Sequence, residues 1–83
     1  MDLVNLTEII IKKLVSDPEN VSVKEFETDE ENTIQIEVLI SEDDMGKVIG
    51  KNGKIINSIR TVVQAASSLS EESKRVRINV DSY

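Results

Sequence analysis

The chain has 83 residues, 39% of them hydrophobic and 31% charged, which fits one small globular domain over residues 1–83. It has no cysteine and no histidine, which excludes disulfides, thiolate metal sites and histidine-activated nucleophiles. We therefore expect no enzyme, cofactor, metal centre or small-molecule substrate. The net charge of −6 at first argues against nucleic acid as a ligand.

Hydrophobic periodicity divides the chain into helices and strands. Apolar residues spaced by three and four predict amphipathic helices, and strict alternation predicts half-buried strands. The predicted elements are a helix over 3–16, strands over 20–27 and 34–40, a short helix over 41–49, a longer helix over 53–66 and a strand over 75–81. We expect Asn5 and Glu8 to cap the first helix. Ser41 should cap the short one, with the acidic run Glu42–Asp44 complementing its dipole.

This order, αββααβ, predicts an α+β fold. Each strand has one apolar face, so the three helices should cover one side of a three-stranded mixed sheet. The first two strands form a hairpin, and the two helices between the last two strands suit a parallel crossover. On the longer helix we expect Ile55, Ile59, Val62 and Ala66 to form the apolar face that packs on the core. Ile56 and Val63 widen this face.

Charge is unevenly distributed along the chain. Residues 45–70 contain four basic side chains and no acidic one, so this window carries +4 and the remainder −10. Exposed charges more than about 8 Å apart are largely screened at physiological salt, so a local basic surface can operate on an acidic protein. The acidic residues of 25–31 predict a solvated turn, with a site for a basic partner as the alternative.

The apolar segment Leu3–Val15 is interrupted by Asn5, Glu8 and two lysines. It is too short and too polar to span a bilayer, and it lacks the features of a signal peptide. We therefore expect a cytoplasmic protein with no membrane insertion.

A glycine-containing segment joins the two helices in the second half of the chain. It reads Val48-Ile49-Gly50-Lys51-Asn52-Gly53-Lys54-Ile55-Ile56. Gly50 can end one helix in a left-handed conformation, and Gly53 lets the chain turn into the next helix. Without side chains at these points a sugar-phosphate backbone can approach the main chain, and the positive end of the following helix lies behind it. Lys51 and Lys54 add cationic donors.

The segment resembles the signature of the KH-domain family, in which two apolar residues precede Gly-x-x-Gly and an isoleucine follows. The element order resembles the type II KH arrangement over nearly the whole chain. In that family the loop clamps about four single-stranded nucleotides. For a lone domain of this length, the resemblance implies an RNA chaperone acting with a second KH protein in control of cell elongation and cell-wall synthesis.

Further basic residues join the candidate site. Lys47 and Arg60 belong to the basic window, and Arg75 and Arg77 lie on the polar face of the last strand, which the resemblance places along the nucleotide groove. Ordinary surface arginines are the alternative. The candidate RNA-binding residues are Lys47, Val48, Ile49, Gly50, Lys51, Asn52, Gly53, Lys54, Ile55, Arg60, Arg75 and Arg77.

Two functions remain open. The first is non-catalytic binding of single-stranded RNA through the loop. The second is a protein–protein adaptor that forms a homodimer, or a heterodimer with another KH protein, through an exposed apolar strip around Val62, Val63 and Ala66. Lysines rather than acidic residues in the loop favour the first. The two functions are compatible, because pairing raises the avidity of a small domain.

Overall fold

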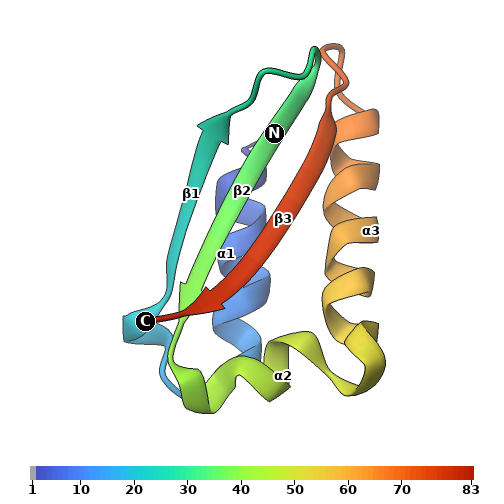
Figure 1. Cartoon of the computed structure of the whole chain (residues 1–83). Coiled ribbons are helices and arrows are strands. Elements are labelled where there is room, and N and C mark those ends of the chain that lie inside the picture. The colour runs from blue at the N-terminus through green and yellow to red at the C-terminus, as the bar shows by residue number, and fades with distance from the viewer. Residues whose placement is uncertain (1) are drawn as a thin grey trace.

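The computed structural model describes residues 2–83, and over this range the helices and strands follow the predicted order (Figure 1). The elements are α1 (Leu3–Leu14), β1 (Ser22–Glu27), β2 (Thr33–Ile40), α2 (Met45–Ile49), α3 (Lys54–Ser68) and β3 (Arg75–Ser82). Short 3₁₀ turns precede β1, α2 and α3. The predicted α+β class and type II order are confirmed.

The sheet has the strand order β1-β2-β3. β1 and β2 form an antiparallel hairpin, and β2 and β3 are parallel, with Ile36 opposite Ile78. The parallel pair is possible because α2 and α3 carry the chain from the end of β2 back to the start of β3. The predicted topology is therefore confirmed.

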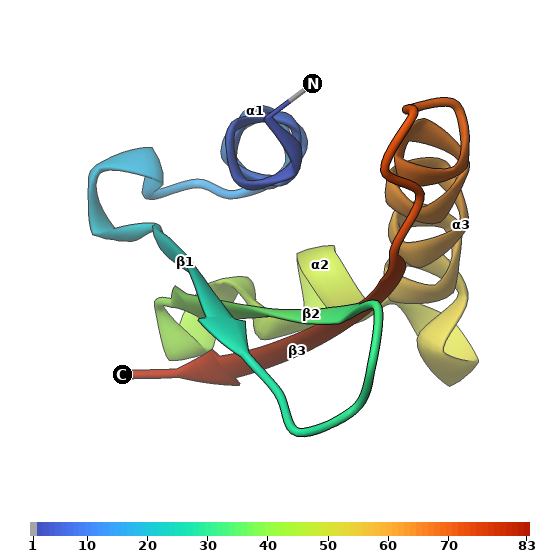
Figure 2. The same ribbon diagram turned by 90° about the horizontal axis from the view of Figure 1, so that it is seen from above.

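All three helices lie on one face of the sheet, which Figure 2 shows from above. α3 runs alongside β3, and α1 lies over β1 and β2. The opposite face carries the alternate, mostly polar side chains of the strands. The glycine loop, which we define as Gly50–Gly53, lies where α2 meets α3. It is therefore at the end of the molecule away from the start of β3.

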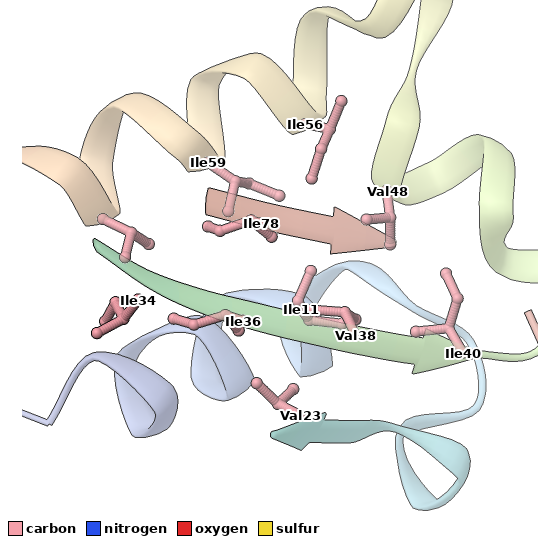
Figure 3. Close-up of a cluster of buried hydrophobic side chains, with 11 residues drawn as sticks. Ile11, Val23, Ile34, Ile36, Val38, Ile40, Val48, Ile56, Ile59 and Ile78 are labelled. Carbon is pink, nitrogen blue, oxygen red and sulfur yellow. The ribbon is translucent and has the colours of Figure 1, made fainter. Parts of the chain in front are cut away.

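The core is almost wholly aliphatic, and most of it is labelled in Figure 3. β2 contributes every second residue, so this central strand presents four buried side chains to the helices. The buried hydrophobic residues are Ile11, Val23, Ile34, Ile36, Val38, Ile40, Val48, Ile56, Ile59, Val63 and Ile78.

The predicted core face of α3 was partly confirmed and partly wrong. Ile56, Ile59 and Val63 are buried, whereas Val62, expected in the core, is 50% exposed. Ile55 is only partly buried against the core. Spacings of three and four fit both sets of residues. The structure selects the set that includes Val63, which is fully buried in the core and therefore cannot belong to an exposed strip.

The predicted caps also need correction. Asp2, not Asn5, caps α1, because its carboxylate Oδ1 accepts the N–H of Asn5 at 3.1 Å. Ser41 precedes the turn before α2, but its hydroxyl donates to Asp17 at 3.3 Å instead of capping that turn. α1 ends at Leu14, two residues earlier than expected, and the chain beyond it is held by Asp44.

Candidate nucleic-acid interface

The glycine loop has a backbone that only certain residues can adopt. Gly50 has φ 75° and ψ 175°, a region essentially reserved for glycine. Asn52 (φ 57°) and Gly53 (φ 73°) are both left-handed, and asparagine is among the few residues that tolerate this conformation. The residue types between α2 and α3 therefore specify one tight turn, in which no side chain covers the main chain at Gly50 and Gly53.

The two glycines have different surroundings. A Cβ at position 50 would lie 2.6 Å from Cγ1 of Ile55, whereas a Cβ at position 53 would have its nearest neighbour, Nδ2 of Asn57, at 3.7 Å. Gly50 is thus needed for packing as well as for conformation. Gly53 is needed for conformation, and the surface beside it is open to a ligand.

Cationic side chains surround this turn. Lys51 and Lys54 are exposed and flank Asn52, which is exposed as well. α3 begins directly at Lys54, so both lysines belong to the segment at the positive end of a 15-residue helix. This end of the molecule can attract and hold phosphate oxygens.

Lys47 is engaged differently. Its ammonium lies 3.6 Å from Oδ1 of Asp44 and donates to the hydroxyl of Ser16. It therefore lies against the junction of α1 and α2, and its charge is partly neutralised there. Lys47 is therefore less available to a phosphate than Lys51 and Lys54 are.

Asp44 is a buried carboxylate that ties α2 to the end of α1. Its Oδ1 accepts the N–H of Ser16 at 2.9 Å and the Ser16 hydroxyl at 2.7 Å, and its Oδ2 accepts the N–H of Asp17 at 3.2 Å. The bond from the Ser16 N–H is the main cause of the lowered pKa of Asp44, followed by the Ser16 hydroxyl. The sequence predicted only a charge for the helix dipole here, and the long-range role was missed.

Arg60 connects the glycine loop region with β3. Its Nε and Nη2 donate to the carbonyl oxygen of Ile78 at 3.2 and 3.0 Å, and its Nη1 donates to Oδ1 of Asn57 at 3.0 Å. Sequence reasoning missed Asn57. The signal was available in the spacing, because Gly53, Asn57 and Arg60 stand at i, i+4 and i+7 on one side of a helix.

Arg75 and Arg77 lie farther from the glycine loop. They line, together with Arg60, a hollow of about 250 Å³ along β3. Arg77 is paired with Glu30 at 2.8 Å, so the acidic turn partly neutralises it. The structure therefore brings the candidate residues together in two groups, one at the glycine loop and one along β3, with Arg60 between them.

A separate apolar groove lies between α1 and α3. Its volume is about 550 Å³, and it is lined by Ile10, Leu14, Lys54, Ile55, Ser58, Ile59 and Val62. Ile9 and Val62 are each 50% exposed. This groove is distinct from the hollow along β3.

Over residues 2–83 no helix is both long and apolar enough to cross a membrane. The same residues contain no cluster of three or more acidic side chains arranged to hold a metal ion.

The fold and the glycine loop together define a class. A Gly-x-x-Gly turn between two helices, beside a sheet with a parallel β2–β3 pair, is the arrangement of a type II KH domain. A family model described as "KhpA/KhpB, KH domain" matches residues 4–80. The chain therefore belongs to the KH-domain family of KhpA and KhpB.

Curated relatives agree with this assignment. The RNA-binding protein KhpA of Clostridium perfringens is 48% identical over 75 residues, covering 90% of this chain and 95% of that protein. KhpA proteins of Clostridium acetobutylicum and Listeria monocytogenes are each 44% identical, covering 90% and 86% of this chain and 95% and 88% of their own lengths. No solved structure matches the chain.

Proposed function

We propose that this domain binds single-stranded RNA without catalysis, with the glycine loop holding the sugar-phosphate backbone. The observation that carries the proposal is the tight turn Gly50–Gly53 at the start of α3, where two half-buried glycines leave the main chain without side-chain cover next to the exposed Lys51 and Lys54. KH domains clamp about four nucleotides with such a loop. The relatives named above as RNA-binding proteins support the same ligand.

The wider role we propose follows from the family. The protein would act in the cytoplasm as an RNA chaperone, together with the second KH protein KhpB, in post-transcriptional control of cell elongation and cell-wall homeostasis. The pairing rests on the resemblance alone, since the matching family model describes a KH domain that occurs in both KhpA and KhpB. The partnership is tested by asking whether the tagged chain captures KhpB from a cell extract. An extract from cells without KhpB is the control and identifies any band that is not KhpB.

The glycine loop is tested by replacing Lys51 and Asn52 with aspartate in one variant. The change replaces +1 by −2 where phosphates must approach, and both positions are exposed. The variant should bind a short single-stranded RNA at least about tenfold more weakly at physiological salt. Fluorescence anisotropy measures the affinity of both proteins.

A matched control places aspartates away from the glycine loop. Lys12 and Lys13 are two exposed residues on α1, and Lys12→Asp with Lys13→Asp changes the net charge by one unit more than the loop variant. If RNA binding depends on the glycine loop, the control should bind more tightly than the loop variant despite its greater negative charge. Equal affinity of the native protein and the loop variant would remove the assigned role of this loop.

A second function, pairing with another KH domain, is favoured by the groove between α1 and α3. Between Lys54 and Ser68, Arg60 is the one charged residue, in a chain of which 31% is charged. The exposed side chain of Val62 lies in the middle of this surface. We propose a second copy of the chain as the occupant, because a two-fold axis through Val62 would bring apolar side chains together without opposing like charges.

A further inference from the structure

The outer edge of β3 is closed by polar side chains of α3. Gln64 accepts the N–H of Val76 at 2.9 Å and donates to the carbonyl of Lys74 at 3.0 Å. Ser67 also bonds the carbonyl and the N–H of Lys74, at 2.6 and 3.0 Å. These side chains take the place of a fourth strand along the first part of β3.

Arg60 completes this row at Ile78. Two of its donors share the Ile78 carbonyl, and Ile78 itself is buried. That carbonyl is therefore already satisfied and cannot easily accept a hydrogen bond from a ligand. A base amino group that approaches β3 at this point meets a guanidinium instead of an acceptor.

The guanidinium of Arg60 is held in one orientation and still has donors to offer. It has five N–H donors, of which the bonds to Ile78 and Asn57 use three. Within residues 2–83 these bonds leave one N–H on Nη1 and one on Nη2 for a ligand. A guanidinium braced from two sides presents these donors with little further loss of side-chain entropy.

The position of Arg60 relative to the glycine loop is set by α3. Asn57 lies against Gly53 and also accepts from Arg60, so a continuous line of contacts runs from the loop to β3. Arg60 lies seven positions after Gly53, which is a rise of about 10 Å along the helix. A strand held by its phosphates at the loop has its bases within reach of Arg60.

We propose that Arg60 selects, at one position of the bound strand, a base with two adjacent hydrogen-bond acceptors, that is guanine or cytosine over adenine or uracil. This inference rests on the proposed RNA binding and specifies which bases the same site prefers. Guanine presents O6 and N7 to a guanidinium, and cytosine presents O2 and N3. Adenine places an amino donor beside N7, and uracil places its N3–H between its two carbonyls.

The experiment uses four single-stranded RNAs of equal length, oligouridine and three versions with one central adenosine, cytidine or guanosine. Because the rest of each strand is uridine, the protein can bind in several registers, including the one that places the central adenosine, cytidine or guanosine at Arg60. The native protein should bind the guanosine and cytidine strands at least about fivefold more tightly than the other two, the range expected for one bidentate contact.

Arg60→Lys keeps the charge and loses the planar fork. It should reduce the preference for the guanosine and cytidine strands to within about twofold, because an ammonium group cannot offer two parallel donors to one base. Asn57→Ala, at an exposed position, should weaken the preference, because the Arg60 guanidinium loses the hydrogen bond to Asn57 that helps to hold its orientation. Thr61→Ala, whose hydroxyl bonds only its own helix backbone within the described chain, is the control and should keep the preference. Melting temperatures of all variants establish that they are folded.

The possible outcomes separate the two proposals. If the native protein binds all four strands alike, or if Arg60→Lys weakens all four by one factor, Arg60 contacts phosphate and the base preference is overturned while RNA binding stands. If the native protein binds none of the four strands, the proposed function fails and the preference with it.

Discussion

A Cβ atom at position 50 would lie 2.6 Å from Cγ1 of Ile55, far inside van der Waals contact. Cγ1 is close to the main chain of α3, so Ile55 cannot move aside by rotating the end of its side chain alone. Gly50 and Ile55 thereby fix how closely the end of α2 approaches the first turn of α3. Because the two helices come this close together, the chain between them must form the tight turn of the glycine loop.

Gly50→Ala should destabilise the fold by at least about 1–3 kcal/mol, because it combines a backbone region reserved for glycine with the overlap against Ile55. Gly46→Ala is the matched control. Gly46 lies in α2 with open space where a Cβ would be, so alanine should stabilise by about 0.4–1 kcal/mol. Urea unfolding measures both changes. A Gly50→Ala protein as stable as the native one would contradict the packing described for Ile55.

The sequence was sufficient to predict the strands, their pairing and the glycine loop, because each depends on a local pattern. Alternation from Ile34 to Ile40 determines the central strand whatever packs on it, and the positive φ angles of Gly50 and Gly53 are set within the loop itself. The features that were missed depend on distant residues. Asp44 bonds to Ser16 across 28 positions in sequence, and nothing near Asp44 indicates that partner. The choice between Val62 and Val63 likewise depends on where α1 and the sheet lie against α3.

Binding of single-stranded RNA should weaken steeply with salt. If the glycine loop and its neighbours neutralise two to four phosphates, the logarithm of affinity should fall against the logarithm of salt concentration with a slope of roughly −1.4 to −3. The loop variant with aspartates at 51 and 52 should show a slope shallower by about 0.7 for each phosphate that it no longer neutralises. Anisotropy titrations over a salt series give both slopes. An unchanged slope would mean that these positions do not contact phosphate.

Acid should destabilise the protein through Asp44. Its pKa is lowered in the folded state, chiefly by the Ser16 N–H, from an ordinary value of 3.8. The unfolded chain therefore takes up the proton first as pH falls. The stability that Asp44 contributes is complete above pH 3.8 and is lost as pH falls from there through the folded pKa.

Asp44→Asn separates this contribution from general acid effects. At neutral pH the variant should melt at least about 5 °C lower, because the bonds from Ser16 and Asp17 lose their charged acceptor. The two melting temperatures should converge as pH falls below 3.8. Melting curves recorded from neutral to acidic pH by circular dichroism make the comparison. A difference that stays constant down to the lowest pH would show that the charge of Asp44 is not what holds α1 to α2.

Val62 and Val63 are neighbours in sequence with opposite environments, and substituting each in turn tests the pairing surface. Val62 is 50% exposed beside the groove between α1 and α3, and Val63 is fully buried. Val62→Glu should leave the stability of a single chain within about 0.5 kcal/mol. It should nevertheless convert a dimer to monomer, because two carboxylates would be buried without partners at the two-fold axis. Sedimentation velocity at tens of micromolar measures the oligomeric state.

Val63→Ala is the opposite control. It should lower the free energy of unfolding by about 2–3 kcal/mol through reduced burial and a residual cavity. At temperatures well below its melting point it should still form dimers, because its side chain lies beneath the helix and not on its outer surface. The proposed pairing surface would be contradicted if the native protein sediments as a monomer, or if Val62→Glu sediments as a dimer. In the second case the α1–α3 groove would not be where two copies meet, and the dimer interface would have to involve another face of the domain.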